Sequence, residues 1–239
     1  VLQELGLKLK LNRWLFLSWL LPVAIWGLAL LIAGLLPGVS YAFSVDAFLE
    51  YYRPSLGEQF SEFETQVRSF HQEYGVHPVV RMLLQALVAG VTLNAFRGLG
   101  EELGWRGLMH HELGVLGASF WHRSLVTGLA WGIWYSPLLV LGLWYRDPTF
   151  AAIPMGIAWC IAASALLGYV RDKSGSIYAP AVLYGSLEGM SKLPPLSQGG
   201  TDLLVGVHGL AGIVALTAVL FGLLAIDRRR AMRASETVG

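Results

Sequence analysis

Long hydrophobic runs separated by short polar segments dominate this chain of 239 residues. Each run approaches the roughly 20 residues that a helix needs to cross the hydrocarbon core of a bilayer. The pattern therefore predicts an all-α, polytopic membrane protein with about six transmembrane helices. The predicted spans are residues 14–36, 78–96, 124–144, 148–170, 176–193 and 203–226. We expect a single membrane domain over residues 1–239, because no repeat or linker divides the chain.

A long polar segment, residues 45–77, joins the first two runs. Apolar side chains recur in it at helical spacing, at Phe60, Phe63, Val67 and Phe70. This spacing predicts an amphipathic helix that lies on the outer surface of the membrane. A docking site for a protein partner is the alternative interpretation.

Lysine and arginine are placed unevenly between the predicted spans, which sets the orientation in the membrane. If both termini are cytoplasmic, most of the 17 basic residues lie in inner segments. The outer segments then hold only Arg53, Arg68, Arg81, Arg146 and Lys192. We expect the inner membrane, or an intracytoplasmic membrane, of a bacterium.

Composition narrows the possible partners. Hydrophobic residues make up 55% of the chain and charged residues 14%, a balance typical of membrane proteins. The formal net charge of +1 offers no concentrated basic face, so we expect the lipid bilayer and no nucleic acid as a partner. The one cysteine, Cys160, excludes an intramolecular disulfide and a zinc site built from several thiolates.

The stretch "GEELGWRGLMHHELG" (100–114) puts paired acids between apolar runs. Glu102 and Arg106 are four residues apart, so a helix places them on one face as an ion pair. Glu101 points about 100° away from Glu102 and is free to face a cavity. We predict a polar helix over residues 101–113 on the cytoplasmic side, either at the membrane surface or dipping into the bundle.

Two further stretches carry polar residues inside predicted spans. Tyr135 precedes a Ser-Pro pair in "WGIWYSPL" (131–138), and Tyr184 and Glu188 lie four residues apart in the fifth run. The spacing predicts that Tyr184 and Glu188 share one helix face. A carboxyl group within the membrane is protonated, paired, or exposed to a water-filled pocket, which makes this region a candidate site.

These stretches, in this order, resemble the CPBP family of CAAX proteases and bacteriocin-processing proteins, also called Abi. The resemblance covers about residues 82–193 and rests on "GEELGWRG", the Trp-Gly-x-Trp stretch ending in Pro, and "SGSIYAPAVLYGSLEG" (174–189). It implies an intramembrane endopeptidase that acts on peptide or prenylated substrates. In that family, the first glutamate of EExxxR activates water, the arginine supports the acids, and two histidines and an asparagine hold the water or a metal and stabilise the oxyanion.

The resemblance assigns Glu101, Glu102 and Arg106 to the EExxxR motif. Tyr135, Tyr184 and Glu188, however, stand where the family has histidine, histidine and asparagine. A phenol titrates near pH 10, so it cannot replace imidazole as a base near neutral pH. The other histidines show no HExxH spacing. We therefore expect no metal ligands, with zinc as the less favoured alternative.

Three functions remain open. The favoured one is a catalytically degenerate family member, a pseudoenzyme that acts as an accessory or scaffold subunit of a larger membrane complex. The second is an active peptidase, in which Glu101 and Glu188 share a proton and serve as base and acid. Tyr135 and Tyr184 would then stabilise the oxyanion.

The third function is binding of a lipid, a prenyl chain or a pigment through His208. This histidine lies in the sixth predicted span among Gly206, Gly209 and Gly212. Small residues allow a helix or a flat macrocycle to approach closely, and neutral imidazole can ligate the metal of a haem or chlorophyll-like ring.

Overall fold

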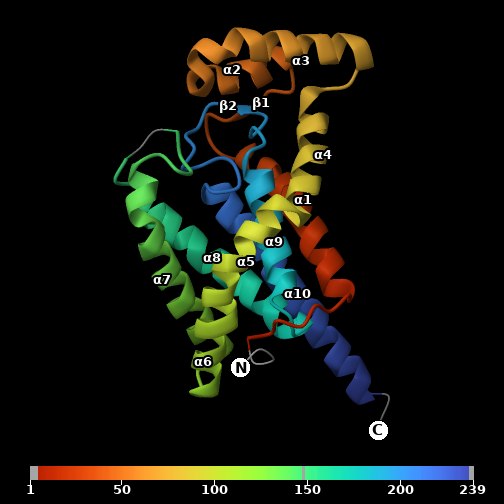
Figure 1. Cartoon of the computed structure of the whole chain (residues 1–239), viewed down its shortest axis with the longest axis vertical. Helices are drawn as coiled ribbons and strands as arrows, with labels where there is room; N and C mark the ends of the chain where they lie inside the picture. Colours follow the sequence, from red (N-terminus) through yellow and green to blue (C-terminus); the bar gives the residue numbers. More distant parts are fainter. Residues whose placement is uncertain (1–4, 147–148, 237–239) are drawn as a thin grey trace.

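Helices form nearly all of the regular structure in the computed structural model, which describes residues 5–146 and 149–236 (Figure 1). The longest are α1 (Arg13–Ala33), α7 (Phe120–Val140), α8 (Ala152–Ser174) and α10 (Leu210–Glu236). The shorter ones are α2 (Val45–Leu56), α3 (Phe60–Tyr74), α4 (Pro78–Val91), α5 (Leu93–Glu102), α6 (His110–Val115) and α9 (Tyr178–Ser191). A 3₁₀ turn (Gly57–Gln59) joins α2 to α3, and a π-helical segment (Leu103–Met109) joins α5 to α6. The all-α prediction is confirmed; two-residue strands β1 (Ser40–Tyr41) and β2 (Ser197–Gln198) pair antiparallel.

Three helices in the described ranges are long and apolar enough to cross a membrane, at Arg13–Ala33, Ala152–Ser174 and Leu210–Ser235. A fourth span is added if Val45–Tyr74 and Pro78–Val91, which meet at a bend of 102°, count as one. The chain is thus a multi-pass integral membrane protein. The predicted number of about six spans is not confirmed, in part because α9 has only 14 residues.

The second predicted span, residues 78–96, is interrupted. The helix stops at Thr92, whose φ of −113° and ψ of −99° lie outside the helical region. It resumes at Leu93, and the π-helical segment carries the chain directly on into α6. Glu102, Arg106 and His110 are buried along this path. One face of residues 101–113 is thus buried against the bundle, while Leu108 on another face is 54% exposed. The predicted cytoplasmic position of this segment stays a prediction.

The prediction that a helix begins at residue 203 is wrong. Helix α10 begins at Leu210, and the residues before it form an irregular segment that folds back on the helix. The left-handed φ of +81° at Gly206 permits this reversal. A Cβ at Gly212 would lie 1.8 Å from the carbonyl oxygen of Val207, so this glycine allows the close return of the loop rather than contact with a macrocycle.

Small residues bring α9 against α4 and α5. A Cβ added at Gly185 would lie 2.5 Å from the backbone nitrogen of Ala95, and one added at Gly189 would lie 2.9 Å from the carbonyl oxygen of Ala86. Two glycines four residues apart let helix backbones approach closely, as in other membrane helix pairs. The Asn94 side-chain amide also donates to the Gly185 carbonyl oxygen at 3.1 Å. This contact fixes α5 and α9 side by side.

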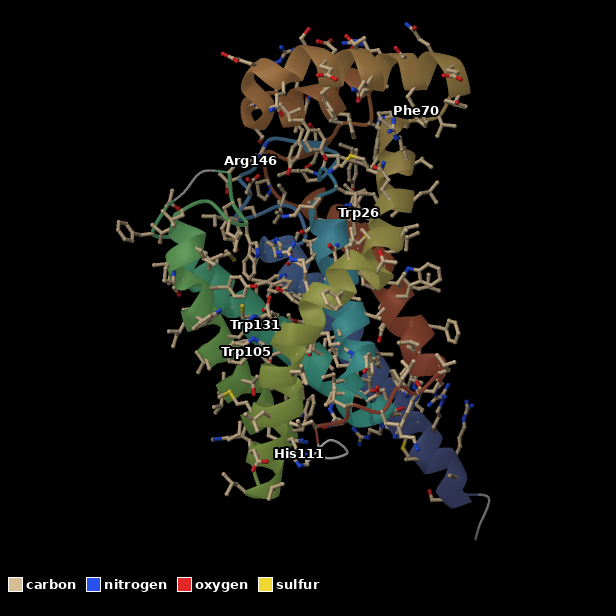
Figure 2. All side chains as sticks on the ribbon, viewed as in Figure 1. Trp26, Phe70, Trp105, His111, Trp131 and Arg146 are labelled. Atoms are coloured by element: carbon tan, nitrogen blue, oxygen red, sulfur yellow. The ribbon has the colours of Figure 1, made fainter. Side chains whose placement is uncertain are left out.

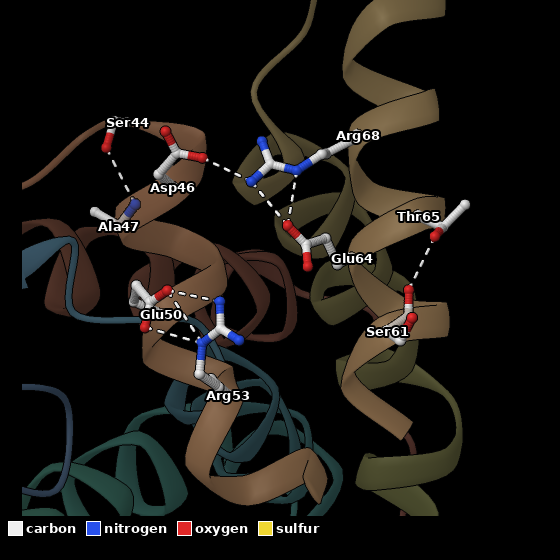
Figure 3. A network of polar contacts seen from close by, with 9 residues as sticks. All are labelled: Ser44, Asp46, Ala47, Glu50, Arg53, Ser61, Glu64, Thr65 and Arg68. Carbon is white, nitrogen blue, oxygen red and sulfur yellow. Dashed lines mark hydrogen bonds and ion pairs between the residues drawn. The ribbon is translucent and has the colours of Figure 1, made fainter. Parts of the chain in front are cut away.

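Helices α2 and α3 lie across one end of the bundle, opposite the end that carries both termini (Figure 1). Their apolar faces bury Phe48, Leu49, Phe60 and Val67. The other face carries ion pairs, among them Arg68 with Asp46 and Glu64 at 2.8 Å each (Figure 3). The predicted amphipathic helix in residues 45–77 is confirmed. Docking of a partner there remains a prediction.

Candidate functional site

A polar cavity of about 250 Å³ lies between α5, α7 and α9. Helix α5 packs on α9 and α7 packs on α8, and the cavity occupies the space between α5 and α7. The residues that line it are Asn94, Arg97, Gly98, Glu101, Tyr135, Leu138, Leu143, Trp144, Tyr184, Glu188 and Lys192. The structure therefore brings together four predicted site residues from three separate stretches: Glu101, Tyr135, Tyr184 and Glu188.

Glu101 is held by neutral hydrogen-bond donors from α7 and α9. The indole Nε1 of Trp131 donates to its Oε2 at 3.1 Å, and the hydroxyls of Tyr135 and Tyr184 lie 2.8 and 3.2 Å from its Oε1. The two hydroxyls are also 3.0 Å from each other. Each phenol has one proton, so two protons serve three oxygen–oxygen contacts. If the two phenols share one proton contact with each other, the other proton is still available to Oε1 of Glu101, so Glu101 accepts a phenol bond in addition to the indole bond.

Glu102 and Arg106 form the predicted ion pair, which is confirmed. The Nη1 atom of Arg106 lies 2.7 Å from Oε1 of Glu102, and both side chains are 0% exposed. The guanidinium also lies over the ring of Trp131, 4.5 Å from its centroid. The Trp131 indole thus contacts the ion pair with its face and Glu101 with its N–H, at the centre of the bundle (Figure 2). This arrangement makes Glu102 and Arg106 supports of the cavity wall rather than parts of its lining.

Trp131 was not among the predicted site residues. It precedes Tyr135 by four residues, so helical spacing already places both on one face of α7. That signal was available in the sequence, although nothing in the motif indicated a hydrogen bond to Glu101.

Glu188 lies next to His208, a pairing that the sequence did not predict. The Nε2 atom of His208 is 3.4 Å from Oε1 of Glu188. The imidazole stacks on Trp144, with centroids 4.4 Å apart and planes 10° apart, and meets Trp159 edge-on at 4.7 Å. Its side chain is only 7% exposed. Because its Nε2 atom is buried and faces Glu188, this arrangement does not favour ligation of a pigment metal through that nitrogen.

A zinc site would need three or four suitable ligands close together. Within residues 5–146 and 149–236, no group of three or more His, Cys, Asp or Glu side chains is placed to hold a metal ion. His110 instead lies 3.3 Å from Asp172. The donor set of the cavity therefore does not fit a zinc centre.

The fold and the site define a multi-pass membrane protein in which Glu101, the first acid of the EExxxR motif, faces a cavity with polar lining. Residues 76–190 match the model of the family of Rce1-like type II CAAX prenyl endopeptidases. This segment runs from just before α4 almost to the end of α9 and contains every predicted site residue except His208. No curated protein and no solved structure matches the chain. The predicted resemblance is confirmed at the level of the family.

Arg146 bonds to Asp202 and to the backbone of Tyr51 near the α2–α3 end of the bundle, an arrangement that we call the arginine clamp (Figure 2). Arg146 binds Asp202 through two nitrogens, with Nε–Oδ2 at 2.9 Å and Nη2–Oδ1 at 2.7 Å. Its Nη1 donates to the Tyr51 carbonyl oxygen at 3.2 Å. The clamp thus links the α7–α8 connection, the segment before α10, and α2. It lies next to the segment that positions His208.

Because of this clamp, we expect the free energy of unfolding to differ between the wild type and Asp202→Asn by an amount that depends on pH. Burial raises the pKa of Asp202, but the hydrogen bonds and charge of Arg146 outweigh burial and hold this pKa below its ordinary 3.8. The stabilisation is fully present above that ordinary value and is lost as the pH falls through the lowered one. At pH 7, Asp202→Asn should cost about 1 kcal/mol, since solvent screens Arg146, which is 40% exposed.

Thermal unfolding in detergent, measured at pH 7 and then at successively lower pH, tests this effect. The difference between wild type and Asp202→Asn should shrink as the pH falls through the lowered pKa, because a protonated aspartate is as neutral as asparagine. A difference of constant size over the whole acidic range would contradict the assignment.

Proposed function

We propose that this chain is a non-proteolytic member of the Rce1-like family, and that it serves as an accessory or scaffold subunit in a membrane complex. The observation that carries the proposal is the set of three neutral donors around Glu101, from Trp131, Tyr135 and Tyr184. Two of these donors, the tyrosines, stand where the family has imidazoles. The polar cavity then serves to bind a ligand rather than to cleave one.

The chemistry of hydrolysis explains the inference. A general base must lie within hydrogen-bond reach of the water it activates. Both oxygens of Glu101 already face side-chain donors, and a water that approached Oε1 would compete with two phenols. At neutral pH these phenols can donate hydrogen bonds but cannot act as bases. Hydrolysis through Oε1 would therefore need Glu101 to exchange a phenol for water, and hydrolysis through Oε2 would have to proceed beside the indole bond.

A peptidase assay tests the proposal. The full-length protein, reconstituted in liposomes, should release no product from a farnesylated CAAX peptide beyond the amount released by Glu101→Gln. Glutamine keeps the size of the side chain and one of its two acceptor oxygens, so it is a conservative control. Cleavage that Glu101→Gln abolishes, while expression and thermal stability are unchanged, would overturn the proposal.

The accessory role has its own test. The detergent-extracted protein should remain with a larger assembly through several purification steps. A lone, monodisperse particle in mild detergent would count against this part of the proposal.

An active peptidase remains the second candidate, because Glu101 and Glu188 line one cavity. In that function one carboxyl group would take a proton from water and the other would protonate the leaving amine. The peptidase assay should then show that Glu101→Gln and Glu188→Gln each abolish cleavage. Loss in only one of the two variants would exclude the shared mechanism.

A further inference from the structure

Glu101 accepts no hydrogen bond from a cationic side chain in the described part of the chain. Its hydrogen-bond partners there are two phenols and one indole. Arg106 is already paired with Glu102. An ammonium group in the cavity would supply this carboxyl group with a charged donor.

Glu188 adds a second acceptor to the same cavity. Its Oε1 atom is buried and receives no hydrogen bond of good geometry from the described residues. His208 lies at ion-pair distance, 3.4 Å, but its Nε2 likewise completes no hydrogen bond there. This oxygen faces His208 and is closed to the cavity, but the Glu188 side chain as a whole lines the cavity and is 24% exposed. An N–H donor in the cavity would find an acceptor in this carboxyl group, which a purely apolar ligand would not use.

Aromatic rings complete the cation-binding character of the cavity. Tyr135, Trp144 and Tyr184 all line it, and the rings of Tyr135 and Trp144 stack with centroids 5.1 Å apart. Aromatic rings attract ammonium groups through the negative potential of their faces. Carboxylates combined with aromatic rings therefore favour an ammonium group over other small ligands.

Two basic side chains also line this cavity. Arg97 and Lys192 are exposed residues of the cavity, on α5 and just after α9. Such side chains bind phosphate oxygens through charge-assisted hydrogen bonds. The cavity thus combines an acidic, aromatic region with two basic side chains, which matches a ligand that carries an ammonium and a phosphate a few atoms apart.

Size and surroundings point to a lipid. The volume of about 250 Å³ is below the roughly 300–1,000 Å³ of sites for drug-sized molecules, and suits a headgroup. Leu138 and Leu143 also line the cavity and are 44% and 43% exposed. On α5, Leu93 and Phe96 are 73% and 80% exposed. Acyl chains can follow these apolar side chains out of the cavity into the bilayer.

The geometry points to an aminophospholipid as the ligand, with its primary ammonium at Glu101 and Glu188 and its phosphate at Arg97 and Lys192. This inference rests on the proposed function, because it names the ligand class of the same non-proteolytic cavity. A primary ammonium is favoured over choline, since only the former can donate hydrogen bonds to the carboxyl groups of Glu101 and Glu188 that line the cavity.

Native mass spectrometry of the full-length protein in detergent tests the inference. The probes are phosphatidylethanolamine, phosphatidylcholine and phosphatidylglycerol with identical acyl chains, together with soluble O-phosphoethanolamine. Phosphatidylethanolamine should bind at least about tenfold more tightly than the other two lipids. Equal binding of all three lipids, a preference for choline or glycerol headgroups, or binding of O-phosphoethanolamine without binding of the lipid would each overturn the inference.

Single substitutions test separately the residues that would bind the ammonium and the residues that would bind the phosphate. Glu188→Gln should weaken binding of phosphatidylethanolamine about tenfold and remove its advantage over phosphatidylcholine. Arg97→Gln, at an exposed position, should weaken all three lipids alike. The matched control is Glu73→Gln on the exposed face of α3, which should change nothing. Unchanged selectivity in Glu188→Gln would contradict the assignment of the ammonium.

The outcome is independent of the peptidase assay. A protein that binds phosphatidylethanolamine as described but also cleaves the CAAX peptide would overturn the proposed function and leave the ligand assignment standing. A protein that does neither would overturn the ligand assignment alone.

Discussion

Replacing Arg106 with methionine should destabilise the protein by about 3–5 kcal/mol, the usual cost of removing one partner of a buried ion pair. The substitution leaves the Glu102 carboxylate at 0% exposure without its counter-charge. It also removes the guanidinium from the face of Trp131. Denaturant- or heat-induced unfolding in detergent, followed by tryptophan fluorescence, measures the change.

Two further variants show whether the lost charge partner is the cause. The double variant Glu102→Met/Arg106→Met removes both charges and should recover at least half of the lost stability. Arg53→Met breaks the solvent-exposed pair with Glu50, whose side chains are 51% and 61% exposed, and should destabilise the protein far less than Arg106→Met. If the double variant were as unstable as Arg106→Met, packing rather than charge would explain the loss.

Gly185→Ala should cost about 1–3 kcal/mol, the range typical of overpacking a tight contact. The new methyl group would lie 2.5 Å from the backbone nitrogen of Ala95, so α5 and α9 must separate. Because Gly185 follows Tyr184 directly, the separation should also weaken the hydrogen bonds to Glu101. The same unfolding assay measures the loss of stability.

Gly27→Ala is the matched control, since nothing lies within 4 Å of a Cβ added at this helical position in α1. There the change should be neutral, or stabilising by up to about 1 kcal/mol through helix propensity. Equal effects of the two substitutions would show that α5 and α9 do not meet as closely as described.

Local spacing predicted most of the candidate site. The i,i+4 rule placed Glu102 with Arg106 on α5 and its continuation, and Tyr184 with Glu188 on α9, because both pairs lie on regular or nearly regular helix. The family motifs then linked three distant stretches that no local rule could connect. The spacing of Gly185 and Gly189 was a further usable signal, for the close approach of α9.

Other features could not be predicted from local patterns. The break at Thr92 has no proline or glycine beside it, so nothing in the hydrophobic run marks it. The contact of His208 with Glu188 depends on an irregular segment held by backbone hydrogen bonds, such as that from Leu210 N to Leu203 O at 2.8 Å. Periodicity describes regular helices, and it carries no information about where such a segment returns.

His208 lies beyond residue 190, where the family segment ends, yet it touches a residue inside that segment. Part of the cavity's chemical environment is therefore encoded outside the sequence shared with the family. In a chimaera that exchanged residues 191–236 for the tail of another member, the transplanted tail would bring its own neighbour for Glu188. We expect such an exchange to alter the ligand preference of the cavity as well as the way in which the C-terminal helix is anchored in the membrane.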